Sequence, residues 1–355
     1  MTKRENLLSL MRRQGYDSVP VEFSLCPHLL QIYQEKTGGA LPFDDYFEFP
    51  WKRVEGIRLP PRDLTIFLPF FDPPLKENAD IDAWGVGHEH SPHSMHMTYM
   101  RHPMRNMTAP EDIDAYPFPD FAGGDTGHMK AQAQSIKKQG LAAVGDMPCT
   151  IWEAAWYLRG MEELMMDMVS QDEMASILLD KVTQLACIRA AAYAKADVDI
   201  LFLGDDIGMQ RTPMMSLALY RAWIKPNLKK VIDTARNINP NIIVFYHSCG
   251  FATPFIDDLI DAGVDVLNPV QSECMDFKEI HAQYGHKISF HGTIGTQTVM
   301  PFGSPEEVRE TVRQNLATAG EKGGLFPAPT HLLEPEVPWE NVLAYVDACR
   351  TYKKL

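Results

Sequence analysis

From about residue 130 onward, the chain alternates short apolar runs with longer amphipathic stretches. Apolar, β-branched runs between turn residues predict buried strands, and a 3.6-residue apolar periodicity predicts helices. The predicted strands are 19–23, 141–144, 198–203, 242–246, 264–267, 287–290 and 324–326. The predicted helices are 160–194, 220–238, 252–262 and 305–320. This alternation indicates parallel pairing through crossover helices and favours a closed (β/α)8 TIM barrel, a single domain over residues 1–355, in which the eighth strand has no clear sequence signal.

Residues 40–125 interrupt the alternation and are rich in Pro, Asp and aromatic residues. We expect them to form an insertion after the first strand that caps the C-terminal face of the barrel. Within it, segment 88–104 is rich in His and Met, a composition found in copper and zinc sites. The alternation from His90 to Tyr99 also suits an exposed hairpin, and we expect this segment, with His96, to line the substrate site.

Charge and cysteine usage exclude several classes of protein. A net charge of −14 disfavours nucleic acid and anionic membrane surfaces as partners. No apolar stretch is long enough to span a bilayer, and the N-terminus reads as a short amphipathic helix without the features of a signal peptide. The six cysteines are scattered, which favours free thiols or metal ligands over disulfides. We therefore expect a cytoplasmic protein.

The end of the strand predicted at 242–246 carries His247 and Cys249. Residues two apart in a strand point to the same side, so the two side chains leave the strand aimed at one point. Imidazole and thiolate are preferred zinc ligands. The alternative is that both are ordinary core residues, since cysteine is among the most buried residue types.

Other predicted strands also end in polar side chains. In parallel barrels the active site forms at the C-terminal ends of the strands, so these groups are expected to converge. They are Asp205, Asp206, Asn268, Gln271, His291 and His331. Each has a structural alternative, such as a helix cap for the aspartates or a turn for Asn268 before Pro269. Their number indicates a shared active site.

Within this ring, His247, Cys249 and His331 form a set of three possible zinc ligands. Catalytic zinc has three protein ligands and one open position. Two neutral imidazoles and one thiolate leave such a site at net +1, which suits polarising an oxygen or binding a thiolate substrate. Nearby aspartates would orient the imidazoles.

The motifs at these strand ends resemble the uroporphyrinogen decarboxylase superfamily, and most closely its cobalamin-dependent methyltransferase branch. They are His247-Ser-Cys-Gly250, Gly204-Asp-Asp-Ile-Gly-Met-Gln210, Leu267-Asn-Pro-Val-Gln271, His291-Gly292 and Pro329-Thr-His331 with Val337-Pro-Trp-Glu-Asn341. The resemblance covers the chain from about Trp84 onward. It implies a (β/α)8 barrel with zinc held by a His-x-Cys pair and a later cysteine. Here His331 stands in place of that cysteine, and Gly295 stands where relatives usually place an aspartate.

The resemblance also implies what the chain lacks. True uroporphyrinogen decarboxylases carry an arginine-rich motif after the first strand that grips a substrate with many carboxylates. The corresponding stretch here, 22–30, contains no arginine. Because an acidic chain without those cations cannot neutralise such a substrate, porphyrin decarboxylation is disfavoured. Arg159 and Arg211 are the cations near strand ends that a decarboxylase would have to use.

The sequence therefore predicts a zinc methyltransferase that works with a corrinoid protein supplied in trans, because no corrinoid-binding domain is present. The substrate would be a small molecule, with an O-methyl donor favoured. His291, Asp205, Asp206 and Gln271 are the expected catalytic residues. Residues expected to bind substrate are Asn268, Tyr157, Glu153 and His96.

Three alternatives to O-demethylation remain. They are a methylcobamide:thiol methyltransferase, a decarboxylase of the uroporphyrinogen type, and a non-catalytic docking or metal-storage module. The oligomeric state is open, with a homodimer possible.

Overall fold

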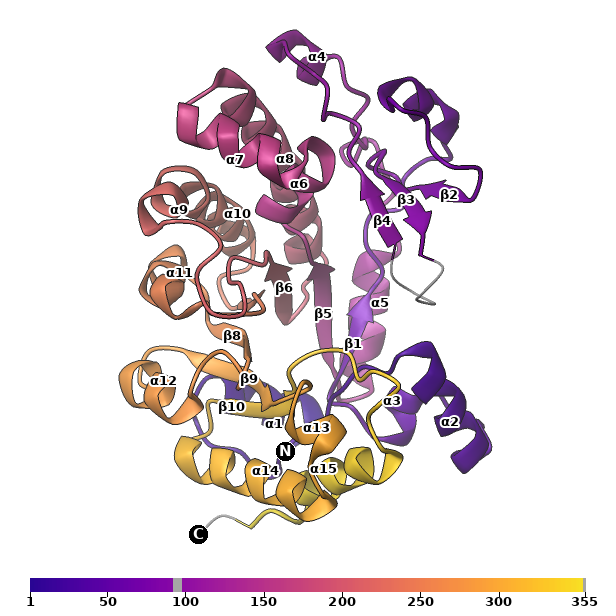
Figure 1. Ribbon diagram of the computed structural model, residues 1–355. Helices are drawn as coiled ribbons and strands as arrows, with labels where there is room; N and C mark the ends of the chain where they lie inside the picture. Colours follow the sequence, from indigo (N-terminus) through magenta and orange to yellow (C-terminus); the bar gives the residue numbers. More distant parts are fainter. Residues whose placement is uncertain (92–97, 354–355) are drawn as a thin grey trace.

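The central element of the computed structural model, which describes residues 1–91 and 98–353, is a parallel sheet of seven strands (Figure 1). Its order follows the chain: β1 (Trp51–Val54), β5 (Ala142–Met147), β6 (Ile200–Gly204), β7 (Ile243–His247), β8 (Val266–Val270), β9 (Ser289–Ile294) and β10 (Leu325–Pro329). The sheet curls as in a TIM barrel and is open between β10 and β1. Strands β6 to β10 are almost wholly buried, as expected where helices cover a parallel sheet.

Helices connect successive strands and cover the outside of the sheet (Figure 1). The larger ones are α5 (Met129–Lys138), α6 (Trp152–Arg159), α7 (Met161–Ser170), α8 (Glu173–Lys195), α9 (Leu217–Trp223), α10 (Lys225–Ile238), α11 (Ile256–Ala262), α12 (Phe277–Tyr284), α14 (Pro305–Ala319) and α15 (Trp339–Thr351). The predicted helix at 305–320 is confirmed as α14, which begins with a capping box between Ser304 and Glu307. The other three predicted helices are also present, each divided into two shorter segments.

The strand predicted at 19–23 is wrong. This segment is extended, but it forms no ladder, and its nearest backbone pairing is a single bridge between Leu25 and Leu333. Pro20 has no N–H to donate, and the backbone of Glu22 bonds the Tyr345 hydroxyl of α15 instead of a neighbouring strand. The segment thus lies at the sheet opening without completing the barrel by hydrogen bonds.

The first strand of the barrel sheet is β1, and it lies inside the range predicted as an insertion. Trp51–Val54 pairs in register with the start of β5. Two of its four residues are charged, so it lacks the apolar run by which the other strands are recognised. The prediction that residues 40–125 lie outside the barrel is therefore wrong for this strand.

The rest of that range forms an accessory region. An antiparallel sheet joins β2 (Ala79–Ile81), β3 (Gly87–His90) and β4 (Thr98–Arg101), so the predicted hairpin pairing is present. The helices of this region are α3 (Phe43–Tyr46), η1 (Leu64–Phe70) and α4 (Pro110–Asp114), and α2 (Pro27–Thr37) precedes it in the chain. Arg159 of α6 holds the accessory region by bonding the carbonyls of Met104 and Met107. A cap over the barrel mouth stays a prediction.

The N-terminal helix α1 (Lys3–Met11) covers the opposite end of the sheet. Arg4 makes two hydrogen bonds to Asp199, just before β6, and the carbonyl of Leu10 accepts from Gly324, just before β10. This leaves the C-terminal ends of the strands as the open end. Among residues 1–91 and 98–353, no helix is long and apolar enough to cross a bilayer.

Candidate active site

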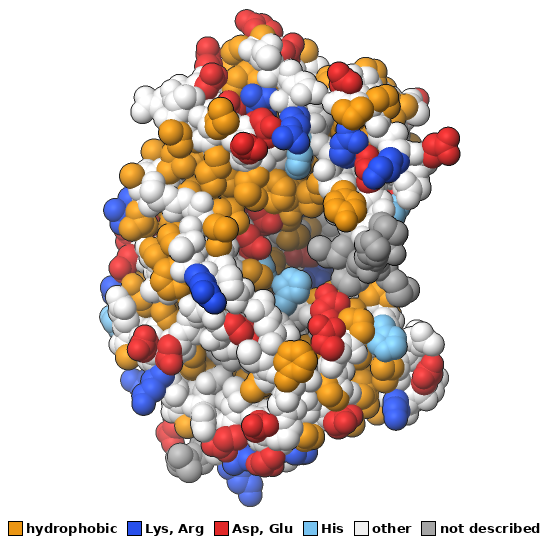
Figure 2. Space-filling model, viewed as in Figure 1, with side chains coloured by type: hydrophobic (Ala, Val, Ile, Leu, Met, Phe, Trp, Pro, Cys, Tyr) orange, Lys and Arg blue, Asp and Glu red, His pale blue; other side chains and the backbone are white. Residues whose placement is uncertain are grey.

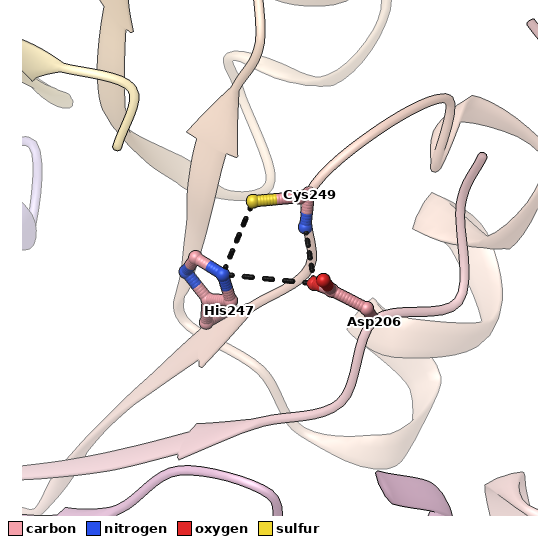
Figure 3. Close-up of side chains that lie close together, drawn as sticks. All are labelled: Asp206, His247 and Cys249. Atoms are coloured by element: carbon pink, nitrogen blue, oxygen red, sulfur yellow. Dashed lines mark hydrogen bonds and ion pairs between the residues drawn. The ribbon is translucent and has the colours of Figure 1, made fainter. Parts of the chain in front are cut away.

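The end of β7 brings His247 and Cys249 together, as their spacing predicts. The sulfur of Cys249 lies 3.3 Å from Nε2 of His247 (Figure 3). Burial lowers the pKa of His247, which favours the neutral imidazole that binds metals. Burial, and then the nearby Asp206 carboxylate, raises the pKa of the Cys249 thiol. A thiolate at this position therefore requires a cation beside it.

Asp206, which follows β6, is the third member of this group. One ligand atom from each of Asp206, His247 and Cys249 lies within 4.8 Å of the others. The Asp206 carboxylate accepts the backbone N–H of Cys249 at 2.7 Å and lies 3.6 Å from Nε2 of His247 (Figure 3). This trio is the candidate metal centre found among residues 1–91 and 98–353.

His331 follows β10 and lies at the entrance to the same region. Its side chain is exposed and is not part of the trio. It has no hydrogen bond or ion pair with any other described residue, and a charge on its ring lowers the pKa of His247. A role as third zinc ligand therefore stays a prediction.

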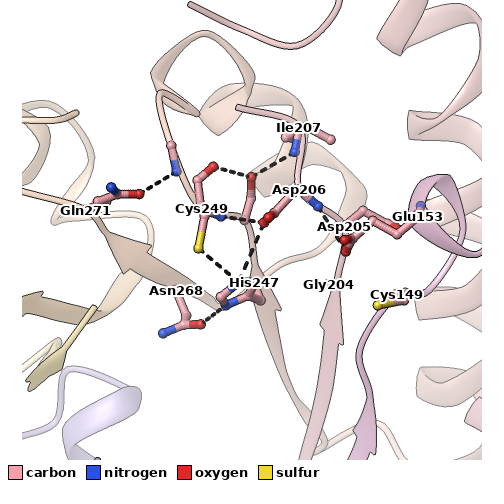
Figure 4. Close-up of polar contacts among 12 residues, drawn as sticks. Cys149, Glu153, Gly204, Asp205, Asp206, Ile207, His247, Cys249, Asn268 and Gln271 are labelled. Atoms are coloured by element: carbon pink, nitrogen blue, oxygen red, sulfur yellow. Dashed lines mark hydrogen bonds and ion pairs between the residues drawn. The ribbon is translucent and has the colours of Figure 1, made fainter. Parts of the chain in front are cut away.

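Asn268 of β8 joins two histidines. Its Oδ1 lies 2.5 Å from Nδ1 of His247, and its Nδ2 lies 2.6 Å from Nδ1 of His291 (Figure 4 shows the first contact). The other ring nitrogen of His291 lies 3.2 Å from the Glu22 carboxylate. Sequence reasoning missed Glu22, although a carboxylate within an otherwise apolar extended run was a visible signal.

The adjacent carboxylates of Asp205 and Asp206 have different surroundings. Asp205 is fully buried and accepts the backbone N–H groups of Ile151 and Glu153 at the start of α6. Burial raises its pKa well above the usual range. The structure thus places Asp205 as a support for α6, whereas Asp206 faces the candidate metal centre.

Glu153, Tyr157 and Cys149 form a cluster behind Asp206. The Tyr157 hydroxyl donates to Glu153 at 3.0 Å, and the other Glu153 oxygen accepts the backbone N–H of Asp206 at 3.2 Å. Burial, with the Asp206 charge as the second cause, raises the pKa of Glu153 to about 7. Burial also raises the pKa of Cys149 to about 12. Both predicted substrate residues here, Glu153 and Tyr157, lie in a layer that supports Asp206.

Gln271 fixes the loop after β7. Its Oε1 accepts the backbone N–H of Gly250 at 2.8 Å. Gly250 has φ of 79° and lies against the backbone of Gly208, where a Cβ atom would come within 2.7 Å. Only glycine allows the loop carrying Cys249 to approach the loop carrying Asp206 this closely.

Two cavities meet at this site. The inner cavity, of about 280 Å³, is lined by residues that include Glu22, Trp51, Arg53, Phe202, Phe245, His247, Asn268 and His291. The outer cavity, of about 550 Å³, is lined by residues that include Asp206, Met209, Gln210, Cys249, Gln271, Phe302 and Glu336. Thr330, His331 and Leu332 line both. Figure 2 shows a hollow in the middle of this face, with hydrophobic side chains gathered above it.

The described histidines of segment 88–104 have protein partners. His88 contacts Asp82 at 3.2 Å, His90 contacts Asp80 at 2.8 Å, and His102 bonds the carbonyl of Tyr157. His96, predicted to bind substrate, lies outside the described residues.

Comparison with known proteins matches most of this chain to one family. The model of the uroporphyrinogen decarboxylase (URO-D) family matches residues 83–352. A methylated-thiol--coenzyme M methyltransferase of Methanosarcina mazei is 24% identical over 258 residues, which are 68% of this chain and 63% of the relative. The match thus spans less than two thirds of that relative's length. A uroporphyrinogen decarboxylase of Pseudomonas syringae pv. syringae is 24% identical over 67% of both chains.

A solved structure supports the fold. It is a methyltransferase from Methanosarcina mazei that covers 98% of both chains with a TM-score of 0.64 at 19% identity. At this identity the likeness concerns the fold alone. The family match over residues 83–352, most of the chain, shows that this protein belongs to the uroporphyrinogen decarboxylase (URO-D) family.

Proposed function

We propose that this protein is a zinc-dependent methyltransferase that moves a methyl group between a small substrate and the cobalt of a separate corrinoid protein. The convergence of His247 Nε2 and Cys249 Sγ beside Asp206, at the open end of the barrel, is the observation that carries the proposal. A family relative named as a methyltransferase supports it.

The donor set fits zinc. His247 and Cys249 supply the nitrogen and sulfur that zinc prefers. Asn268 accepts from Nδ1 of His247, which leaves Nε2 free to bind a metal. When bound, zinc would act as a Lewis acid that polarises a methoxy oxygen or lowers the pKa of a thiol.

We propose His331 as the third ligand, with Asp206 as the alternative. The Asp206 carboxylate already accepts the N–H of Cys249, whereas His331 has no such engagement within the described residues. Zinc with His247, Cys249 and His331 has net charge +1, and replacing His331 by Asp206 makes the site neutral. The more positive site favours demethylation of an O-methyl donor, the direction we propose.

The two cavities suit two different reactants. His247 faces the inner cavity, whereas Cys249 and Asp206 face the outer one. We assign the small substrate to the inner cavity, where Trp51 and Phe202 offer apolar surface, and the corrinoid protein to the wider outer cavity. The candidate metal centre then lies between the two reactants.

A methyltransferase acting on a thiol is the second candidate, favoured by the name of the Methanosarcina relative. Decarboxylation of a tetrapyrrole is disfavoured. Arg53, the arginine lining the inner cavity, is paired with Asp146 at 3.0 Å, and Glu22 adds a negative charge there.

Of the predicted cations, Arg159 is buried and engaged with Asp167 and with backbone carbonyls, so it is not available to a substrate.

Elemental analysis tests the proposal. We expect about one zinc per chain in the wild type and none in Cys249→Ser, while Cys187→Ser on α8 serves as a control that keeps its zinc. Methyl transfer from methoxylated donors to a corrinoid should disappear with the zinc. A wild-type protein that carries no zinc, or that decarboxylates a porphyrinogen without metal, would overturn the proposal.

A further inference from the structure

Glu22 holds a carboxylate in the wall of the inner cavity. Both backbone groups of Glu22 bond the Tyr345 hydroxyl, at 3.2 Å and 3.0 Å, which fixes the residue in the extended segment at the sheet opening. Its side chain is 15% exposed and lines the inner cavity. Within the described part of the chain, this carboxylate accepts no hydrogen bond.

Asn268 determines which nitrogen of His291 carries a proton. If Nε2 of His247 is to bind a metal, its Nδ1 carries the proton and donates to Oδ1 of Asn268. The amide Nδ2 of Asn268 then faces His291 and donates to its Nδ1, at 2.6 Å. Because that nitrogen acts as the acceptor, a neutral His291 carries its proton on Nε2.

Among the described residues, this proton has no hydrogen-bond partner. His291 is 4% exposed, and its Nε2 forms no hydrogen bond with the described residues, although the Glu22 carboxylate lies 3.2 Å away. Within the described residues, a buried N–H donor without a hydrogen bond therefore lies beside a partly exposed carboxylate that accepts none. An unsatisfied buried donor is costly, and the cost is removed when a ligand pairs with it.

The chemistry of the pair selects the ligand group. A carbonyl or ether oxygen would accept from His291 and leave Glu22 unpaired, and a carboxylate would be repelled by Glu22. An ammonium would pair with Glu22 and leave the N–H of His291 without an acceptor. A hydroxyl satisfies both, because its oxygen accepts from His291 while its hydrogen is donated to Glu22.

We propose that Glu22 and His291 bind a hydroxyl group of the small substrate, with Asn268 as the positioning residue that sets the His291 tautomer. This inference rests on the proposed function, and it narrows the substrate class to a methyl donor with an apolar body and a free hydroxyl. The walls suit that body, since Trp51 lies nearly parallel to the His291 ring at 5.9 Å and Phe245 meets its edge at 5.1 Å.

Calorimetric binding of two probes to the full chain tests the inference. The probes are 2-methoxyphenol and methoxybenzene, which differ only in the hydroxyl. We expect the wild type to bind 2-methoxyphenol about tenfold to a hundredfold more tightly. Glu22→Leu should reduce the preference to about twofold, and Glu22→Gln, which keeps an acceptor oxygen, should retain part of it. Glu35→Leu, at an exposed glutamate of α2, is the control and should keep the full preference.

Nitrogen NMR of the histidine rings gives a second readout that needs no turnover. We expect His291 to carry its proton on Nε2 in the wild type and to show a mixture of tautomers in Asn268→Leu. Equal binding of the two probes, no binding of either, or an unchanged preference in Glu22→Leu would overturn the inference. Zinc content and methyl transfer, measured on the same preparations, report separately on the proposed function.

Discussion

The inner and outer cavities meet at His331 but differ in size and in the groups they expose. The inner cavity, about 280 Å³, has aromatic walls and carries the linked imidazoles of His247 and His291. The outer cavity, about 550 Å³, exposes Cys249 and amide and carboxylate side chains. Two apolar side chains also stand in its wall: Met209 is 53% exposed and Phe302 is 78% exposed.

Under the proposed function, this difference suits two reactants of unlike size. A small, largely apolar substrate gains most from burial between aromatic side chains, whereas a protein-bound corrinoid needs a wide opening. His247 faces one cavity and Cys249 the other, although their ligand atoms lie 3.3 Å apart. Substitutions on the two sides should therefore have separable effects.

The residue shared by both cavities should give the largest effect. We expect His331→Ala to lower zinc affinity about a hundredfold or more, because it removes a proposed ligand. Asp206→Asn should lower it less than about tenfold, since the amide oxygen can still accept the N–H of Cys249. Competition with a colorimetric zinc chelator measures both affinities.

If Asp206→Asn lowers zinc affinity more than His331→Ala does, Asp206 is the third zinc ligand. The site would then be neutral, and the preferred reaction would change from O-demethylation to methyl transfer onto a thiol. Donor and thiol turnover by the two variants would check that consequence.

Blocking the inner cavity should give the next largest effect. Ser24 is exposed and lines this cavity, so Ser24→Phe places a ring at its opening with little strain on the core. We expect the dissociation constant of a bound methoxylated donor to rise about a hundredfold, since the ring occupies the substrate volume. Zinc content should stay at the wild-type level.

Ser135→Phe on α5, where the serine is also exposed, is the matched control for the added ring. Unchanged donor binding in Ser24→Phe would show that the small substrate does not bind in the inner cavity.

Sequence reasoning succeeds here where one strand carries its own signal. The run before His247 is apolar and β-branched, and the side-chain alternation of a strand puts Cys249 on the same side, so half of the candidate metal centre follows from local geometry. The strand β1 is missed because Lys52 and Arg53 interrupt its apolar character. Its place in the sheet depends on pairing with β5, more than eighty residues later.

The roles of adjacent carboxylates cannot be separated from sequence in the same way. Asp205 and Asp206 look equivalent, but one accepts N–H groups of α6 and the other faces Cys249. The difference arises from which way each side chain leaves the end of β6, and that depends on how α6 packs there. Glu22 is recognised only when the distant residue His291 is placed 3.2 Å from it.

The cluster of Glu153, Tyr157 and Cys149 behind Asp206 should make the free energy of unfolding depend on pH. The pKa of Glu153 is about 7 in the folded protein against an ordinary value of 4.5, so the folded state holds a proton that the unfolded state has lost between these pH values. Its contribution to stability is therefore present at low pH and is lost as pH rises toward 7. Glu153→Gln removes this loss.

At pH 8 we expect metal-free Glu153→Gln to be about 2 kcal/mol more stable than the wild type, and at pH 4 nearly equal. Urea unfolding of chelator-treated protein at a series of pH values measures this. Glu162→Gln, at an exposed glutamate of α7, is the control. If the free energy of unfolding depends on pH in the same way in the wild type and in Glu153→Gln, the pKa of Glu153 is not raised in the folded protein.

The rim of the outer cavity should give the smallest effect, and it tests whether that side receives the corrinoid protein. Phe302 ends the short helix α13 (Val299–Phe302) and is 78% exposed. A side chain so exposed contributes little to folding, but it can bury its ring against a partner. We expect Phe302→Ala to raise KM for the corrinoid protein about tenfold, with donor binding and zinc content unchanged.

Val169→Ala, at a valine of α7 that is 70% exposed and lines neither cavity, is the matched control and should leave that KM unchanged. Ser24→Phe should weaken donor binding alone, and Phe302→Ala should weaken binding of the corrinoid protein alone, so the two variants together test the two cavities separately. If Phe302→Ala instead weakens donor binding and leaves KM for the corrinoid protein unchanged, the outer cavity admits the small substrate. The corrinoid protein would then be assigned to the inner cavity, because its cobalt would have to reach the site past His247 rather than past Cys249.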